Sequence, residues 1–250
     1  MNYNDFSSKY VLGREEVYQA SPRIWSFQFA NDIVNGINLR LSNMAGGFPF
    51  EFNRHRFTSS ECLYLCGEWS YDTDEHRSIQ EELMRQVSGF ACKRFIKSKY
   101  RKQVREDFHT FRLQWMLFCV WQKCKGNADF RKLLLSIPHD AVLVENTTKD
   151  KWESAEIWGC RNRELVAYRE NLKTEIRKAN PTTKQKELEQ YINIETNKIN
   201  SIGMWRGQNN IGKILMICQD CIINGTEPAI DFDLLRDARI YILGELLQFD

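Results

Sequence analysis

The sequence predicts a helix-rich α+β fold. Its first fifty or so residues hold short apolar runs typical of strands, whereas from Thr58 onward the apolar residues recur with helical spacing. The chain has five prolines and thirteen glycines in 250 residues, and no Gly/Ser/Pro-rich linker divides it. We therefore expect one compact domain over residues 1–250, with a small β-sheet packed among helices.

The expected elements follow in chain order. Strands are expected within RIWSFQFA (23–30) and GFPFEFNRHRFT (47–58), separated by a loop that contains two glycines and a proline. Long helices are expected at 59–70, 75–104, 106–124 and 127–136, the last ended by Pro138. A buried strand is expected at 140–146, and helices at 206–224 and 231–248.

The stretch from about 161 to 202 has a different pattern. Two narrow apolar stripes lie on otherwise charged helices, and Asn180-Pro181 separates them. The stripes consist of Leu165, Tyr168, Leu172 and Ile176, then Leu188, Ile192 and Ile199. We expect a helical hairpin inserted into the domain, either as a solvated pair or as an arm that contacts a partner or substrate.

Composition sets aside several classes of protein. The 42% hydrophobic and 27% charged content is ordinary for a globular protein, and a net charge of +2 excludes a strong overall field for capturing nucleic acid. No run approaches the roughly 18 apolar residues of a membrane helix, and no secretory signal is visible. We expect a cytoplasmic protein without membrane contact, whose eight cysteines are free thiols.

No motif indicates a metal or another cofactor. Cys218 and Cys221 form the one CxxC pair, and no second pair completes a zinc site. The glycine-rich nucleotide loops, the HExxH motif and the GxSxG motif are also absent from the sequence. We therefore expect chemistry that needs no cofactor.

What remains is a set of acidic and aromatic residues. A carboxylate can stabilise the positive, oxocarbenium-like transition state of glycosidic cleavage, and a buried carboxylic acid can protonate the leaving group. Aromatic rings give a base a face to stack on. The candidates are Glu61, Glu68, Trp69, Glu145, Asp150, Trp152, Trp158 and Trp205.

The stretch TSSECLYLCGEWS (58–70) holds two of these acids. Thr58 and Glu61 have the spacing of a capping box, which leaves Glu61 with either a structural or a catalytic role. Glu68 lies two turns further along the same face, directly after Gly67, a residue that weakens a helix interior. A glycine there is expected where a ligand or another backbone comes close.

A basic segment follows at 93–105, KRFIKSKYRKQVR. Seven of its thirteen residues are Lys or Arg, interleaved with Phe95 and Tyr100. The segment is either a solvated helix face or a ridge that grips phosphates, with Lys93 and Arg94 as its first cations.

Four segments in series resemble the NADAR family, also called YbiA-like. They are LSN at 41–43 followed by FPFEF, FTSSE at 57–61, FRKLLLSIPHDAVLVENTTKD at 130–150, and GQNNIGKILM at 207–216. The resemblance covers about 40–216 apart from the insertion. It implies a compact helix-rich domain that binds ADP-ribose-like or ribosyl-phosphate ligands and hydrolyses N-glycosidic bonds.

The resemblance also implies site residues. Asn43 matches the asparagine of LSN, Glu61 the glutamate of TSxE, and Asp150 the acid five residues after the glutamate of LVE. Gly207, Asn209 and Gly212 match the closing GxNxLG loop. Trp158 matches the family Trp-Gly in identity, whereas Trp152 is nearer the expected spacing.

One position departs from the family pattern. Where the family has a lysine on the TSxE helix, this chain has Glu68, which puts an amine-dependent mechanism in doubt. Glu68 thereby becomes a candidate general acid or base, with Asp150 as its partner or as a ribose anchor. Glu61 and Asn43 are expected to orient the ribose, and Trp69 or Trp158 to stack on a base.

These observations predict an N-glycosidase that removes ADP-ribose from modified guanine bases in DNA, like the family members that act as antitoxins to DarT-type toxins. The Gly207–Gly212 loop is expected to bind pyrophosphate. Two alternatives stay open. One is cleavage of a riboflavin-pathway ribosyl-phosphate intermediate, and the other is a non-catalytic module that binds ADP-ribose or a cognate ADP-ribosyltransferase toxin.

Overall fold

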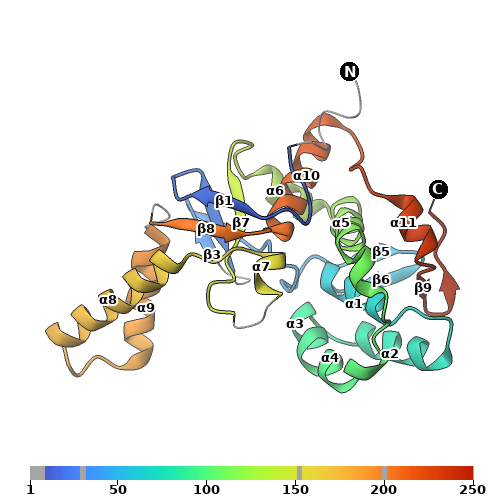
Figure 1. Cartoon of the computed structure of the whole chain (residues 1–250), viewed down its shortest axis with the longest axis horizontal. Coiled ribbons are helices and arrows are strands. Elements are labelled where there is room, and N and C mark those ends of the chain that lie inside the picture. Colours follow the sequence, from blue (N-terminus) through green and yellow to red (C-terminus); the bar gives the residue numbers. More distant parts are fainter. Residues whose placement is uncertain (1–8, 29–31, 151–153, 199–201, 250) are drawn as a thin grey trace. The chain divides into compact units, whose positions relative to one another are not determined.

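The computed structural model describes residues 9–28, 32–150, 154–198 and 202–249 (Figure 1). The chain forms two compact units. Unit 1 consists of Met1–Tyr10, Arg40–His139 and Ile214–Asp250, and unit 2 of Val11–Leu39 and Asp140–Lys213. Helices and short strands are mixed along the chain, which confirms the helix-rich α+β class. The single domain with its insertion stays a prediction.

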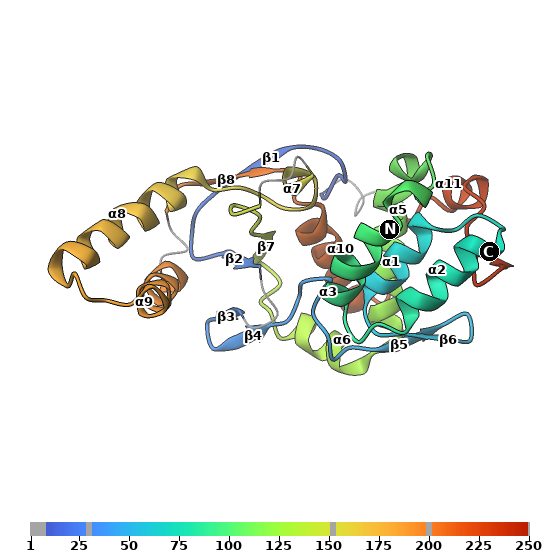
Figure 2. The same cartoon turned by 90° about the horizontal axis from the view of Figure 1, so that it is seen from below.

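Unit 1 is mainly helical. Its longer helices are α1 (Ser60–Glu68), α2 (Asp74–Met84), α5 (Phe108–Gly126), α6 (Ala128–Leu135), most of α10 (Asn210–Asn224) and α11 (Phe232–Asp237). Two antiparallel hairpins accompany them, β5 (Phe50–Phe52) with β6 (His55–Phe57) and β9 (Tyr241–Ile242) with β10 (Glu245–Leu246). Figure 2 shows α1 beside α2 and α5.

Helix α1 lies at the centre of unit 1. All nine of its residues are buried, and it packs chiefly against α5. The indole of Trp115 on α5 donates to the Tyr64 carbonyl at 3.0 Å, directly over Gly67. A Cβ at Gly67 would collide with Trp115 Nε1 and lie 2.7 Å from its Cδ1. The close neighbour that Gly67 requires is therefore a tryptophan side chain, and neither a ligand nor a backbone.

Unit 2 is built on short strand pairs. Strand β1 (Glu16–Gln19) pairs antiparallel with β8 (Met204–Gly207), and β2 (Ile24–Phe27) pairs parallel with β7 (Val142–Glu145). Strands β3 (Asp32–Val34) and β4 (Ile37–Leu39) form a hairpin, and α7 (Ala155–Trp158) is a single turn of helix. The core between these elements contains Ala20, Ile24, Val144, Cys160, Leu165 and Trp205.

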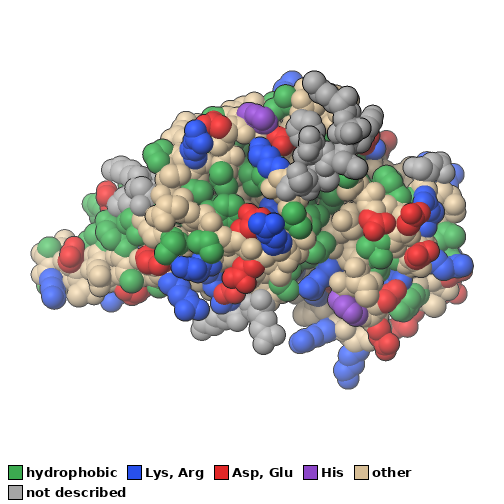
Figure 3. Space-filling view, turned by 45° about the horizontal axis from the view of Figure 1, so that its top comes forward, with side chains coloured by type: hydrophobic (Ala, Val, Ile, Leu, Met, Phe, Trp, Pro, Cys, Tyr) green, Lys and Arg blue, Asp and Glu red, His purple; other side chains and the backbone are tan. Residues whose placement is uncertain are grey.

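Helices α8 (Arg163–Ala179) and α9 (Gln185–Lys198) form the expected helical hairpin. Leu165, Leu188 and Ile192 of the two apolar stripes are buried. Glu189 on α9 lies 3.5 Å from Arg169 and 3.3 Å from Lys173 on α8, which holds the pair together. Hydrophobic side chains also remain exposed on this arm, as Figure 3 shows.

Two of the expected helices are wrong. The helix expected at 75–104 ends at Met84, and after Ser88 the chain continues as short pieces: α3 (Gly89–Ala91), the π-helical turn η1 (Cys92–Ile96), α4 (Lys97–Lys99) and η2 (Arg101–Gln103). A Cβ at Gly89 would lie 2.8 Å from Glu61 Cβ and 3.0 Å from Met44 Cα. The break lets this backbone pack directly on α1.

The helix expected at 231–248 ends at Asp237, and a β-hairpin follows. Arg239, Leu243 and Gly244 have φ values of 48°, 51° and 83°, which reverse the chain. The buried Gln80 side chain on α2 donates to the Tyr241 carbonyl at 2.8 Å and accepts from the Leu243 amide at 2.6 Å. These bonds satisfy hairpin backbone groups that a helix would have paired internally.

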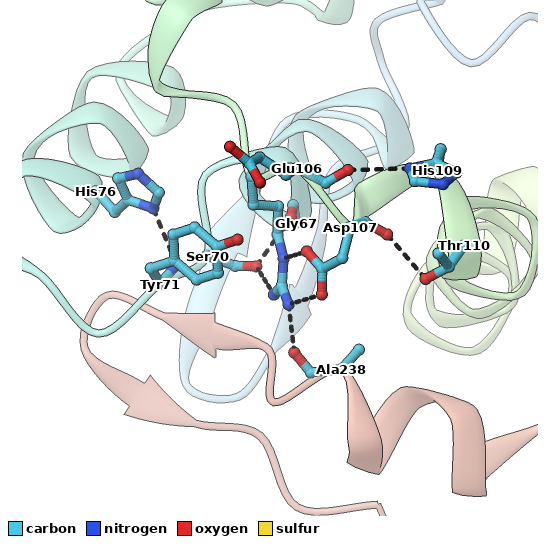
Figure 4. Close-up of polar contacts among 10 residues, drawn as sticks. Gly67, Ser70, Tyr71, His76, Glu106, Asp107, His109, Thr110 and Ala238 are labelled. Carbon is cyan, nitrogen blue, oxygen red and sulfur yellow. Dashed lines mark hydrogen bonds and ion pairs between the residues drawn. The ribbon is translucent and has the colours of Figure 1, made fainter.

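Arg105 joins the ends of three helices (Figure 4). Its guanidinium binds both carboxylate oxygens of Asp107 at 2.6 and 2.7 Å and donates to Ser70 Oγ at 2.8 Å and to the Ala238 carbonyl at 2.5 Å. The Arg105 amide donates to the Glu68 carbonyl at 3.0 Å. Bidentate pairing by a buried guanidinium fixes geometry, so Arg105 sets where α1 ends relative to α5 and α11.

All eight cysteines are buried free thiols, as expected. Over the described ranges, no cluster of His, Cys, Asp and Glu has the makings of a metal site. In those ranges, no helix has the length and apolar character to cross a bilayer.

Gly67→Ala should destabilise unit 1, because the added methyl meets the Trp115 indole. Overpacking of this kind costs roughly 1–3 kcal/mol. Urea unfolding followed by tryptophan fluorescence measures the loss. Gly46→Ala is the matched control, since a Cβ at Gly46 meets nothing within 4 Å. Equal stability of the two variants would contradict the packing argument.

Candidate functional site

Helix α1 presents two glutamates on one face. Glu61, Tyr64 and Glu68 have the spacing of neighbours along a helix surface, and the two glutamates are only 6% and 3% exposed. A buried carboxylate is expensive unless it is paired, hydrogen-bonded or neutral. Each glutamate therefore needs a specific reason to be there.

The capping box expected for Thr58 and Glu61 is wrong. The N-cap of α1 is Ser59, whose hydroxyl accepts from the Cys62 amide at 3.2 Å. Thr58 instead donates to the Gln86 carbonyl at 3.3 Å. Within the described ranges, the Glu61 carboxylate makes no hydrogen bond or ion pair. Glu61 therefore does not have the capping-box role that would explain its position on structural grounds.

Glu68 is held by one partner. Lys97 Nζ lies 2.7 Å from Glu68 Oε1, whereas the other oxygen, Oε2, is buried and has no hydrogen-bond partner in the part of the chain that the structure describes. Burial raises the pKa of Glu68, and the charge of Lys97 opposes this only in part. Glu68 is thus a carboxyl group that can hold a proton at a pH where an exposed glutamate is ionised.

The pairing of Lys97 with Glu68 was not predicted from the sequence. The two residues are 29 positions apart, and the π-helical turn η1 lies between them, with the Lys97 amide donating to the Cys92 carbonyl. No local pattern indicates such a pair. The π-helical geometry is itself common at functional sites.

Lys123 was also missed. It lies in the last turn of α5, fully buried, with its ammonium 3.8 Å from the centre of the Phe130 ring. Burial lowers the pKa of Lys123 to about 8, and the negative charge of Glu61 works against that shift. The amine of Lys123 is therefore only partly protonated near pH 8, and it interacts electrostatically with Glu61.

Asn43 and Trp69 have structural contacts. Asn43 is buried, accepts from Ser60 Oγ at 2.9 Å and donates to Met116 Sδ at 2.7 Å, so it ties the LSN loop to α1 and α5. Trp69 is fully buried and donates to the Tyr100 carbonyl at 3.0 Å. Its ring has no exposed face for the stacking role expected of it.

Lys93 and Arg94 lie on the π-helical turn and are exposed. Lys93 is near enough to Glu68 to lower its pKa slightly. The partner of Glu68, Lys97, thus comes from the basic segment 93–105, whose role as a solvated face or a phosphate-gripping ridge stays a prediction.

The predicted loop residues of unit 2 pack against β7 and α7. The Asn209 side chain donates to the Leu143 carbonyl at 2.8 Å and accepts from the Glu145 amide at 3.1 Å. A Cβ at Gly212 would collide with the Leu143 carbonyl, and one at Gly207 would collide with the carbonyl of Gly159. These three residues let the start of α10 approach the strand closely.

The amides of the same loop are already used. The Gln208 amide donates to the Glu156 carbonyl at 2.7 Å, and the Asn209 amide donates to the Gly159 carbonyl at 3.2 Å. These two groups therefore do not serve the pyrophosphate role expected of the Gly207–Gly212 loop.

Asp150 and Trp158 also belong to unit 2. Asp150 is exposed, and its carbonyl accepts from Arg161 at 2.9 Å. Trp158 ends α7 and is partly exposed. Trp152, the alternative tryptophan, lies outside the described residues. The pairing of Asp150 with Glu68 stays a prediction.

No protein-family model matches the chain, and no curated protein is similar to it. Among solved structures, the NMR structure of the E. coli protein YbiA is similar, with 19% sequence identity and a TM-score of 0.49. The match covers 83% of this chain and 88% of that chain.

The raised pKa of Glu68 has a consequence for stability. Below its unfolded-state pKa the carboxyl is neutral in both states, and above that pKa the unfolded state ionises first, so the wild type loses stability until the pH has passed the raised folded-state pKa. Glu68→Gln should therefore gain stability relative to the wild type as the pH rises above about 4.5. Urea unfolding at a series of pH values measures the difference.

Glu82→Gln is the control, because its effect on stability should change with pH in the opposite direction. Hydrogen bonds from Tyr100 and Lys99 lower the pKa of Glu82, so the wild type should gain stability over that variant as the pH rises. A pH-independent difference for Glu68→Gln would show that Glu68 ionises like an exposed glutamate.

Proposed function

We propose that this protein is an N-glycosidase that removes ADP-ribose from modified guanine bases in DNA. The observation that supports this most directly is Glu68, a buried carboxyl with a raised pKa, one oxygen bound to Lys97 and the other without a partner in the described structure. Such a group suits proton donation to a leaving base. The family resemblance of the sequence supplies the substrate class.

In the proposed reaction, Glu68 donates its proton to the nitrogen that leaves with guanine. The electrons of the bond between the anomeric carbon and that nitrogen go to the base, and the ribose carbon becomes oxocarbenium-like. Water then attacks this carbon and loses a proton to the carboxylate of Glu68, which restores the acid. The products are guanine in DNA and free ADP-ribose.

The other groups of α1 suit supporting roles. Glu61, seven residues before Glu68 on the same face, would stabilise the positive charge on the ribose or orient the water. Asn43 would contact the ribose beside Glu61, and Lys93 and Arg94 would bind phosphates. Asp150, Trp158, Gly207, Asn209 and Gly212 belong to unit 2, and their roles stay predictions from the family resemblance of the sequence.

The direct test is incubation with an oligonucleotide that carries ADP-ribosylated guanine, with free ADP-ribose measured by chromatography. Release should occur without added metal or cofactor. No release at stoichiometric enzyme would overturn the proposal.

Glu68→Gln should lower the rate of release by at least about 100-fold, because the amide cannot donate the proton. Single-turnover kinetics on the modified oligonucleotide measures the loss. Glu81→Gln, a surface change on α2, is the matched control. A rate for Glu68→Gln within a few fold of the wild type would remove Glu68 from the mechanism.

Lys97→Met should move the alkaline limb of the pH–rate profile to higher pH. The Lys97 charge holds down the pKa of Glu68, so its removal should keep the acid protonated further into the alkaline range. The profile of kcat/KM against pH measures the shift. An unchanged or lowered alkaline limb would show that the limb belongs to another group.

A second candidate is a non-catalytic module that binds ADP-ribose or a toxin. The ion pair of Glu68 with Lys97 favours it, since this pairing can hold the carboxylate ionised. Calorimetry would then show tight ADP-ribose binding while the modified oligonucleotide stays intact.

Cleavage of a free ribosyl-phosphate in preference to the oligonucleotide would instead indicate the riboflavin-pathway reaction.

A further inference from the structure

The segment 86–97 carries an exposed aromatic residue that neither the sequence motifs nor the proposed reaction accounts for. Phe90 is 54% exposed, and Val87 on the turn before it is 84% exposed. Val87 lies in the break of the helix expected at 75–104, and Phe90 lies in α3 directly after that break. Large apolar side chains this exposed are most informative where polar or charged groups surround them.

This turn is fixed against α1 at the end that carries Glu61. Thr58 Oγ1 donates to the Gln86 carbonyl at 3.3 Å, and Ser88 Oγ caps the Ala91 amide at 3.2 Å. The backbone of Gly89 packs on Glu61 so closely that a Cβ there would lie 2.8 Å from Glu61 Cβ. Phe90 is therefore the exposed residue next to the one that touches Glu61.

The segment then reaches the other end of α1. Lys97 meets Glu68 at 2.7 Å, eight residues after Gly89 meets Glu61. Phe90 and Lys93–Arg94 thus lie on a stretch of chain that runs along α1 from one glutamate to the other.

The positive charge of the segment favours the binding of a polyanionic ligand. No Asp or Glu occurs from Arg85 to Arg105. Lys93, Arg94, Arg101 and Lys102 are exposed, and the Arg94 guanidinium lies 6.0 Å from the centre of the Phe90 ring. Figure 3 shows Lys and Arg side chains projecting at the lower edge of the view, where Figure 1 places α3 and α4.

We propose that Phe90 is a stacking residue for a nucleobase and that Lys93 and Arg94 hold the flanking phosphates of a single strand. Proteins that bind single-stranded nucleic acid combine a cationic track with aromatic side chains on which bases stack. A duplex would bury its base faces, whereas a ring raised on a turn needs an unstacked base. This inference rests on the proposed function, whose substrate it narrows to single-stranded nucleic acid.

The experiment uses the full chain and an unmodified, fluorescein-labelled 15-mer of single-stranded DNA, with binding followed by anisotropy over a range of salt concentrations. The single strand should bind with saturation and more tightly than a duplex of the same sequence. Phe90→Ala should weaken binding about 5- to 150-fold, the range expected for one stacked base. Phe90→Trp should retain binding.

Lys93→Ala/Arg94→Ala should lower the slope of log K against log salt by about 1.4, since each phosphate contact on a single strand contributes about 0.7. Leu135→Ala on α6 is the control for an exposed apolar residue, being 46% exposed. Lys125→Ala/Lys132→Ala, two exposed lysines of the same unit, is the control for charge. Both control variants should bind like the wild type.

The inference is overturned if the single strand does not bind, if the duplex binds as tightly, if Phe90→Ala binds like the wild type, or if the salt slope is unchanged. Because the probe is unmodified, binding is measured without catalysis. Oligonucleotide binding without ADP-ribose release would reject the glycosidase while supporting this surface. ADP-ribose release from a modified nucleoside without strand binding would reject the surface and support the glycosidase.

Discussion

The burial of α1 along its whole length is the constraint on which unit 1 depends. A helix enclosed on every side can hold a carboxylate only where a cation, a hydrogen bond or a proton compensates for lost hydration. Glu68 has Lys97 on one oxygen. The helix is also fixed in position, by Trp115 over Gly67 and by Arg105 at its end. Two acids are thus held on a rigid element.

Elements with a strong local period could be predicted from the sequence. Strands β2, β5, β6 and β7, helices α5, α6 and α10, and the α8–α9 hairpin all lie within or close to the expected ranges. The errors lie where distant contacts decide the backbone. Gly89 packs on Glu61, and Gln80 pairs with the β9–β10 hairpin, so both helix continuations are lost although the apolar spacing continues.

The candidate site could be predicted only in part. Glu68 stands out in the sequence because it stands where the family pattern that the sequence resembles has a lysine. Its partner Lys97 follows a π-helical turn that no residue propensity indicates. Asn209 and Gly212 fit the family loop, and the structure accounts for them by packing against Leu143. A sequence motif identifies residues that are required, but it does not distinguish those required for packing from those required for chemistry.

The π-helical turn at Cys92–Ile96 links this site to chain length. A π turn contains one residue more than the α-helical turn it replaces, so loss of one residue there would convert it to an α-helical turn and leave the pieces on either side near their places. The same loss between Ile96 and Lys97, in α-helical geometry, would rotate the residues that follow by about 100° and carry the lysine away from Glu68. The π turn therefore makes the pairing of Lys97 with Glu68 tolerant of a change in chain length at this one place.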